Sequence, residues 1–197
     1  MGSSKQNWAT PPNLFAGWKE EYGLNLDVCA EAWNAKLPAF ITEAQDGLKT
    51  PWLLREMAPL YTMGSAEPTS YSRGGYKHPA VAYCNPPYSQ TSKWLDKAMD
   101  ESGRGVFTLM LVPASTGTKW FFDAATKCAF WLFKGRISFV APPGVEDNHR
   151  PNFSPALIEV GGAGRGFLGY RDAKTGAPVY YTGGPFGLKD KVKGESS

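Results

Sequence analysis

The segment from Val81 to Tyr88 constrains the fold more than any other part of the chain, because an apolar run leads directly into Asn85 and two consecutive prolines. Proline has no backbone N–H and a fixed φ, and it drives the residue before it into an extended conformation. Residues 81–84 are therefore predicted to be a strand that ends at Asn85. Residues 89–92 include side chains able to cap a helix, which we expect over residues 93–99.

Apolar and amphipathic runs alternate along the rest of the chain. The spacing of apolar residues predicts helices at residues 11–23, 50–56 and 118–126. Short apolar runs predict strands at residues 24–30, 39–42, 106–112 and 129–133. Strands that alternate with helices imply an α/β fold, with a mostly parallel sheet covered by helices on both faces. Several glycines after residue 160, followed by Val179–Thr182, predict an antiparallel C-terminal hairpin.

The length of the chain, 197 residues without an internal repeat, predicts a single domain over residues 1–197. Residues 57–78 are rich in Gly, Ser, Pro and Tyr, and we expect a long loop there. The polar residues 189–197 are expected to form a disordered tail. The sequence shows no apolar run long enough to cross a bilayer and no charged-then-apolar leader, so we expect a cytoplasmic protein.

The cysteine and histidine content argues against several classes of site. Cys29, Cys84 and Cys128 have no close-pair spacing, and the chain has two histidines. We therefore expect no metal site and no disulfide framework. With two histidines in the chain, a hydrolase triad that depends on histidine is not expected.

Positive charge is concentrated in the second half of the chain. Residues 119–197 carry eleven Lys and Arg against seven Asp and Glu, whereas residues 1–118 carry ten against eleven. A polyanion is therefore expected to meet the second half more readily. An ordinary solvated surface would produce the same pattern, so charge alone leaves both interpretations open.

Residues 85–88, with the sequence Asn-Pro-Pro-Tyr, have the chemistry of a pocket for an exocyclic amine. The Asn85 side-chain oxygen and the Pro86 carbonyl can each accept a hydrogen from an NH2 group, and the two prolines hold these acceptors rigidly. Tyr88 offers a flat face on which a base can stack. The alternative interpretation is that these four residues form only a turn.

The Asn-Pro-Pro-Tyr sequence resembles the catalytic motif of amino-group methyltransferases that use S-adenosylmethionine. Over about residues 8–160, further motifs follow the order seen in the phage-type DNA N6-adenine methyltransferases, the Dam-like family: Trp8–Pro11, Leu26–Ala30, Asn34–Lys36, Asp46–Leu48 with Trp52, Asn85–Tyr88 and Gly135–Phe139. This resemblance implies a Rossmann-like methyltransferase fold. It also implies transfer of a methyl group from S-adenosylmethionine to the N6 amine of a flipped adenine in DNA.

The resemblance further implies roles for individual residues. The catalytic residues would be Asn85, Pro86, Pro87 and Tyr88, and the cofactor-binding residues would be Trp8, Thr10, Pro11, Asp27, Cys29, Ala30 and Asp46. Asp27 would orient the methionine amino group of the cofactor, the Trp8–Pro11 segment would close over its methionine end, and Asp46 would reach its adenine amine. Glu31 and Asn34 could contact the ribose or could be exposed polar residues. The turn after Asp27 departs from the usual glycine-rich fingerprint, since it reads Val-Cys-Ala.

Contacts with DNA are expected from basic side chains in the second half of the chain. Lys134, Arg136 and Arg150 lie in polar segments that also contain aromatic residues, as a phosphate-binding loop does. Each could equally be a solvated loop charge. The chain shows no evident separate target-recognition domain, so we expect short or relaxed sequence specificity.

Three alternatives to adenine methylation remain at the level of sequence. Enzymes that methylate cytosine N4, RNA bases or protein glutamine share the same tetrapeptide and an NH2-type substrate. A catalytically idle relative could serve as a nucleic-acid-binding or protein-binding module. Without the family resemblance, the chain would be a generic α/β nucleotide-binding domain.

Overall fold

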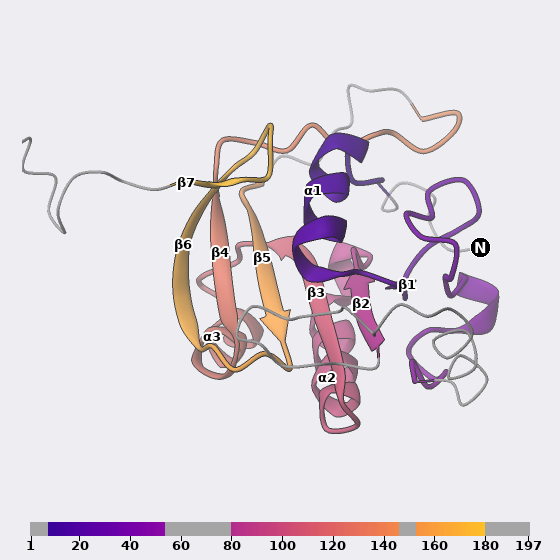
Figure 1. The fold of residues 1–197 in the computed structure, drawn as a ribbon, viewed down its shortest axis with the longest axis horizontal. Helices are drawn as coiled ribbons and strands as arrows, with labels where there is room; N and C mark the ends of the chain where they lie inside the picture. The colour runs from indigo at the N-terminus through magenta and orange to yellow at the C-terminus, as the bar shows by residue number, and fades with distance from the viewer. Residues whose placement is uncertain (1–7, 54–79, 146–152, 180–197) are drawn as a thin grey trace, which may run out of the picture.

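The computed structural model describes residues 8–53, 80–145 and 153–179, and Figure 1 shows their arrangement as one sheet with helices packed against it. The predicted loop at residues 57–78 and the predicted tail at residues 189–197 lie outside these ranges. Within the described ranges, no helix combines the length and the apolar character that a membrane crossing requires.

The described residues form a single seven-stranded sheet with the order β1-β2-β3-β5-β4-β6-β7. Its strands are β1 (Leu26–Asp27), β2 (Ala80–Cys84), β3 (Val106–Pro113), β4 (Ala129–Lys134), β5 (Pro155–Val160), β6 (Gly166–Asp172) and β7 (Pro178–Val179). Strands β1, β2 and β3 are mutually parallel, and β4 is parallel to β6. Strand β5 lies antiparallel between β3 and β4. Five strands therefore run in one direction, whereas β5 and β7 run in the other.

Helices cover both faces of this sheet, as the sequence predicted. They are α1 (Pro12–Tyr22), α2 (Thr91–Ser102) and α3 (Lys119–Lys127). Buried side chains of α1 pack on one face in a cluster with Phe107 and Leu109 of β3. Buried side chains of α2 and α3 pack on the opposite face in a cluster with Val106 and Met110. Because β3 is apolar on both sides, its sequence shows no alternation between polar and apolar residues.

A buried polar network fixes α1 to the sheet. The Arg171 guanidinium on β6 donates to both carboxylate oxygens of Glu21, at 2.6 and 2.8 Å, and to the Tyr22 hydroxyl at 2.7 Å. Tyr22 in turn donates to Glu159 on β5, which also accepts from the Trp131 indole. Bidentate, charge-assisted bonds of this kind favour one arrangement of α1, and the residues that immediately precede α1 reach the candidate site.

Several expected elements differ in the structure. Residues 24–30 contribute only the two-residue β1, and residues 39–42 form no named strand, only a bridge between Phe40 and Asp27. Of the helix expected at residues 50–56, residues 50–53 are not helical and residues 54–56 lie outside the described ranges. A 3-10 helix at Glu43–Gln45, whose N-terminus is capped by a capping box from Thr42, lies before them. The expected cap of α2 is also wrong, because Gln90 at the N-cap makes no side-chain capping bond. A short 3-10 turn, Tyr88–Gln90, leads into this helix instead.

The C-terminal part combines a confirmed and a missed element. The expected antiparallel hairpin is present as β6 and β7, which pair through Tyr170 with Val179 and Arg171 with Pro178. Strand β5 was not expected. It inserts between β3 and β4, so that three of the six strand pairings are antiparallel in the described residues.

Candidate active site

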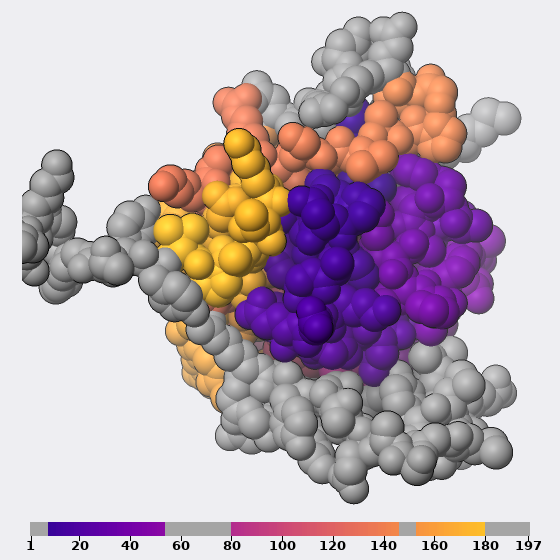
Figure 2. Space-filling view, turned by 45° about the horizontal axis from the view of Figure 1, so that its top comes forward, coloured from indigo at the N-terminus to yellow at the C-terminus, as the bar shows by residue number. Residues whose placement is uncertain are grey.

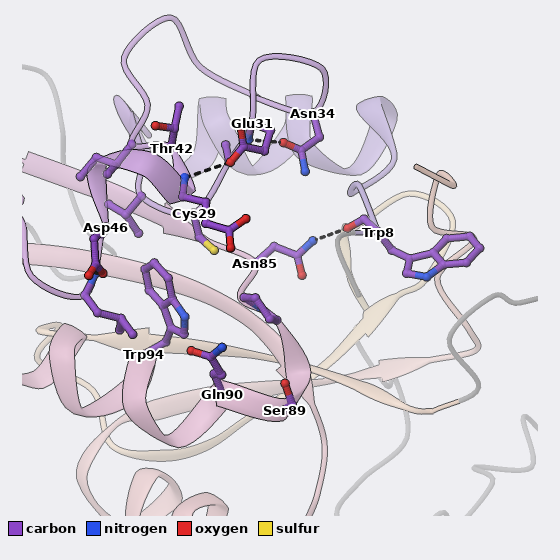
Figure 3. A pocket seen from close by; sticks show the side chains of 17 residues that line it. Trp8, Cys29, Glu31, Asn34, Thr42, Asp46, Asn85, Ser89, Gln90 and Trp94 are labelled. Carbon is purple, nitrogen blue, oxygen red and sulfur yellow. Dashed lines mark hydrogen bonds between the residues drawn. The ribbon is translucent and has the colours of Figure 1, made fainter. Parts of the chain in front are cut away.

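A cavity of about 530 Å³ lies where β1 and β2 end, and Figure 3 shows it from close by. Because β1 and β2 are parallel, the chain segments that follow them leave from the same edge of the sheet, which is where α/β proteins bind ligands. The cavity is lined by Trp8, by residues 28–31 and 34 after β1, by residues 41–43 and 46–48, by Asn85 and Pro87 after β2, and by Ser89, Gln90 and Trp94.

Asn85 presents an unused acceptor at this cavity. Its Nδ2 donates to the main-chain carbonyl of Trp8 at 2.7 Å, with a longer contact of 3.4 Å to Thr10 Oγ1. Its Oδ1 is buried and has no hydrogen-bond partner among the described residues. Figure 3 shows that oxygen turned away from Trp8. Leaving a buried acceptor without a partner costs about 1–3 kcal/mol of stability, so the Asn85 oxygen is an acceptor that a ligand N–H can satisfy.

Tyr88 belongs to an aromatic cluster beside Asn85, which we define as Tyr88, Phe139 and Phe153. The Tyr88 ring meets Phe153 edge to face at a centroid distance of 4.6 Å and Phe139 at 6.3 Å. Its hydroxyl is buried without a partner in the described part of the chain, and burial raises the pKa of Tyr88 well above its ordinary value. The phenol is therefore neutral. Neither Tyr88 nor Pro86 lines the cavity, whereas Asn85 and Pro87 do.

Asp27 lies beneath the cavity wall and does not line the cavity itself. Its carboxylate accepts the backbone N–H of Lys36 at 3.0 Å and that of Cys29 at 3.4 Å. It is 2 % exposed, and loss of hydration raises its pKa to about 6, although these backbone bonds act in the opposite direction. Asp27 therefore organises the turn of residues 28–36, of which residues 28–31 and 34 line the cavity.

Asp46 lines the cavity from a strained turn. It ends the 3-10 helix in the left-handed region, with φ 52°, and it is the one non-glycine residue of the described ranges with positive φ. Its carboxylate pairs with Lys49 at 2.7 Å and accepts the Leu48 N–H, and these hydrogen bonds, with that of Lys49 the larger, hold its pKa below the ordinary value. Asp46 is thus ionised and partly open to solvent, as an acceptor for a ligand amine should be.

Gly47 allows the Asp46 turn to approach the rest of the site. A Cβ atom at position 47 would lie 2.5 Å from the Val28 carbonyl oxygen and 2.8 Å from the Trp94 ring. Only glycine permits this close contact, because both neighbours are large or part of the backbone. The cavity therefore depends on direct packing between the turn after β1, residues 46–48 and α2.

Glu31 joins the segment after β1 to the 3-10 helix Glu43–Gln45, and Asn34 stabilises the segment after β1. Glu31 accepts the Glu43 N–H at 2.9 Å, and Asn34 accepts the Glu31 N–H at 2.6 Å. Cys29 and Ala30 line the cavity with small side chains, and burial raises the pKa of the Cys29 thiol, which is therefore not a nucleophile. No three His, Cys, Asp or Glu side chains of the described ranges are grouped to hold a metal ion.

The other predicted residues of the described ranges lie outside the cavity. Thr10 is buried and bonded to Tyr83, and Pro11 precedes α1 at its N-cap position. Lys134 and Arg136 are exposed where β4 ends, and Arg150 lies outside the described residues. Ser89, Gln90 and Trp94 also line the cavity and were not expected there, because the segment after Tyr88 has only the pattern of a helix start.

Residues 135–140 form the chain segment that leads from the exposed end of β4, at Lys134 and Arg136, to the candidate site. Ala9 and Val140 exchange both of their backbone hydrogen bonds, at 2.9 and 2.8 Å, which holds the N-terminal segment against the chain after β4. Figure 2 shows the residues leading to 145, in orange, against the N-terminal part in indigo. Phe139, in the same stretch, contacts Tyr88.

Comparison with known proteins assigns the chain to a family. The family model described as DNA N-6-adenine-methyltransferase (Dam) matches residues 1–63 and 70–161, which include both the Asp46 turn and Asn85–Tyr88. The chain is 26 % identical over 162 residues to the DNA N-6-adenine-methyltransferase of Haemophilus phage HP1, a match that covers 79 % of each protein. It is 27 % identical over 128 residues to the DNA N-6-adenine-methyltransferase of Escherichia phage T1, covering 64 % of this chain and 44 % of the T1 protein. The chain belongs to the Dam family of DNA N-6-adenine methyltransferases.

Proposed function

We propose that the cavity beside Asn85 holds S-adenosylmethionine and that Asn85 binds the amino group of the target adenine. Methylation of adenine N6 in DNA, with S-adenosylmethionine as the methyl donor, is the activity of the Dam family. The observation that carries the proposal is the buried, unpartnered Asn85 Oδ1 at the cavity. Three adjacent parallel strands, helices on both faces and a cavity at the strand ends support a Rossmann-like methyltransferase fold.

The size and polarity of the cavity suit an elongated cofactor. Its volume of about 530 Å³ falls within the range of cofactor sites, roughly 300–1,000 Å³. Asp46 and Trp8 lie at opposite ends of it in Figure 3. The ionised Asp46 offers acceptors to the adenine amine of the cofactor, and Glu31 offers a carboxylate to a ribose hydroxyl. The methionine and methyl end then falls near Trp8, next to Asn85.

Asp27 supports cofactor binding through the turn of residues 28–36. Its two backbone hydrogen bonds hold Cys29 and Lys36 in place, and the small side chains of Cys29 and Ala30 let a ligand approach the wall. We therefore assign Asp27 a positioning role, which replaces the direct contact with the methionine amino group that the family resemblance implies.

Asn85 stabilises the amine as it is methylated. S-adenosylmethionine supplies a methyl group on a positively charged sulfur, which leaves as a neutral thioether. The N6 lone pair of adenine is delocalised into the ring, which makes the amine a poor nucleophile. An acceptor that binds an N6 hydrogen favours a more tetrahedral nitrogen, whose lone pair is less delocalised and can attack the methyl carbon. Positive charge develops on N6 as its bond to the methyl carbon forms, and the preorganised Asn85 Oδ1 dipole stabilises that charge. The N6 proton then passes to solvent.

The aromatic cluster is the place for the flipped base. Tyr88, two residues beyond Pro86, carries a neutral ring beside Asn85, and Phe139 and Phe153 surround it. Extrusion of a base from duplex DNA costs roughly a few kcal/mol, which stacking on an aromatic ring offsets in part. Entry of the base requires these rings to rearrange, because the Asn85 and Tyr88 polar atoms are covered in the structure.

Basic residues near the cluster suit the DNA backbone. Lys134 and Arg136 are exposed at the start of the stretch that leads to Phe139, which contacts Tyr88, and we assign them contacts with DNA phosphates. Because the proposed substrate is DNA, we propose that the protein acts in the cytoplasm of a bacterial host cell.

Two substitutions separate the proposed roles. Asn85→Ala should slow single-turnover methylation by roughly 100-fold or more while cofactor affinity, measured by calorimetric titration, stays unchanged, because the lost acceptor acts in the transition state. Asp46→Asn should weaken cofactor binding by about tenfold and leave the rate at saturating cofactor nearly intact. Full activity of Asn85→Ala, or unaltered cofactor affinity in Asp46→Asn, would overturn the corresponding assignment.

A further inference from the structure

We propose that Thr10 and Tyr83 are positioning residues: their hydroxyl pair holds the Trp8–Thr10 segment so that the Trp8 carbonyl orients the Asn85 amide for catalysis. This inference rests on the proposed function, in which Asn85 Oδ1 is the acceptor for the target amine. It assigns Thr10 to the catalytic side of the site, although the family resemblance implies a cofactor contact for this residue.

The orientation of the Asn85 amide is decided by the Trp8 carbonyl. A carbonyl oxygen only accepts hydrogen bonds, so the group that faces it at 2.7 Å must be Nδ2. The Oδ1 atom is then directed to the opposite side, where it is buried and has no partner in the described ranges. With the amide turned over, two oxygens would face each other across that distance, and the acceptor would be lost to the substrate.

Two contacts hold the Trp8 carbonyl in position. On one side of the chain, Ala9 exchanges backbone hydrogen bonds with Val140. On the other, Thr10 Oγ1 and the Tyr83 hydroxyl share a buried hydrogen bond of 2.5 Å. Both residues are 1 % exposed, and the same Thr10 oxygen lies 3.4 Å from Asn85 Nδ2. Residues 8–10 are thereby fixed in direction as well as in place.

Tyr83 is a suitable anchor because the core fixes its ring. Phe15 of α1 meets the ring edge to face at 5.0 Å, and Trp18 of α1 lies 6.5 Å away. Tyr83 lies on β2, two residues before Asn85, so one short stretch of chain carries both the anchor and the group that is oriented. Burial keeps the phenol protonated, since it raises the pKa of Tyr83 well above its ordinary value.

A purely structural role would not require these hydroxyls. The pair lies against the apolar cluster between α1 and the sheet, where Val and Phe together would keep nearly the same shapes and leave no polar atom to satisfy, whereas either replacement alone leaves one buried hydroxyl without its partner at about 1–3 kcal/mol. The hydroxyls supply a directional bond that joins the segment before α1 to the strand before Asn85. We therefore expect their removal to affect the chemical step more than the fold.

The test compares Thr10→Val and Tyr83→Phe with Thr10→Ser, which keeps the hydroxyl. The matched controls are Thr126→Val, on the exposed side of α3, and Tyr170→Phe, on β6. Thr10→Val and Tyr83→Phe should each lower the single-turnover rate at saturating DNA and cofactor by roughly 10- to 100-fold, with cofactor affinity unchanged, and Thr10→Ser should restore most of the rate. Wild-type rates in both variants, or a loss of cofactor binding that accompanies the loss of rate, would overturn the inference.

A double-mutant cycle with Asn85→Ala separates this inference from the proposed function. If Thr10 acts through Asn85, then Thr10→Val should cause little further loss in the Asn85→Ala background. The same fold-loss in both backgrounds would show that Thr10 acts by another route. An active Asn85→Ala single variant would instead overturn the proposed function, whereas an inactive one combined with fully active Thr10→Val and Tyr83→Phe would overturn only the positioning role.

Discussion

Asn85 Nδ2 lies 2.7 Å from the main-chain carbonyl oxygen of Trp8, a residue 77 positions earlier in the chain. This contact joins the N-terminal segment to the end of β2 and determines which atom of the Asn85 amide faces a substrate. It also gives a reason for asparagine at this position, because a carboxylate would place an oxygen against the carbonyl.

We therefore predict that Asn85→Asp is impaired although it retains an acceptor. The aspartate should be repelled by the Trp8 carbonyl, which raises its pKa and favours the protonated form that can donate to Trp8. Single-turnover rates should be about tenfold or more below wild type at pH 8 and should recover relative to wild type as the pH is lowered. A rate ratio that is independent of pH would contradict this account.

Asp27 should make stability depend on pH. Its pKa of about 6 in the folded protein exceeds the ordinary 3.8, so the protonated form is favoured by folding. Its contribution is present below about pH 4 and is lost as the pH rises through about 6, with a total on the order of 3 kcal/mol. Asp27→Asn lacks this titration. The difference in free energy of unfolding between wild type and Asp27→Asn should therefore change between pH 4 and pH 7, and a constant difference would show that Asp27 is not buried as described.

Gly47→Ala should disturb the cavity wall. The added Cβ would lie 2.5 Å from the Val28 carbonyl oxygen, so the Asp46 turn must move. We expect a loss of about 1–3 kcal/mol in the free energy of unfolding, together with weaker cofactor binding in calorimetry. Gly17→Ala is the matched control, since a Cβ at Gly17 on α1 would meet nothing within 4 Å. That control should be neutral or stabilising by about 0.5–1 kcal/mol. Equal behaviour of the two variants would argue against the close packing.

Lys134 and Arg136 should contribute to DNA affinity through phosphates. Each replacement by alanine should reduce the dependence of log affinity on log salt concentration by about one unit without altering which site is methylated. Lys127→Ala, at the end of α3, serves as a control for general charge loss. If all three variants gave the wild-type salt dependence, the DNA-binding surface would have to lie elsewhere.

The sequence predicted the parts of the fold that depend on local patterns. Helix α1 was expected at residues 11–23 and occupies Pro12–Tyr22, because its apolar spacing and Gly23 are local signals. Strand β5 was missed since it carries Glu159, an unusual residue in a fully buried strand. Only the fold shows that Tyr22 and Trp131 satisfy that carboxylate.

The candidate site was predictable from the sequence where residues line the cavity and less so where they lie behind its wall. Asn85, Asp46 and Cys29 were expected from motifs and do line the cavity. Asp27 and Thr10 belong to the same motifs but lie behind the wall, because their partners, the Lys36 N–H and the Tyr83 hydroxyl, come from positions that spacing alone does not reveal.

The central claim is that Asn85 Oδ1 binds the N6 amine of the flipped adenine. Once the methylated site has been mapped, duplexes carrying either adenine or purine, which lacks the amino group, at the target position can be compared for affinity in the presence of S-adenosylhomocysteine. The wild-type enzyme should bind the adenine duplex about tenfold more tightly than the purine duplex, and Asn85→Ala should bind both alike. If Asn85→Ala kept the wild-type preference for adenine, Asn85 would not be the acceptor and the account of the active site would be wrong.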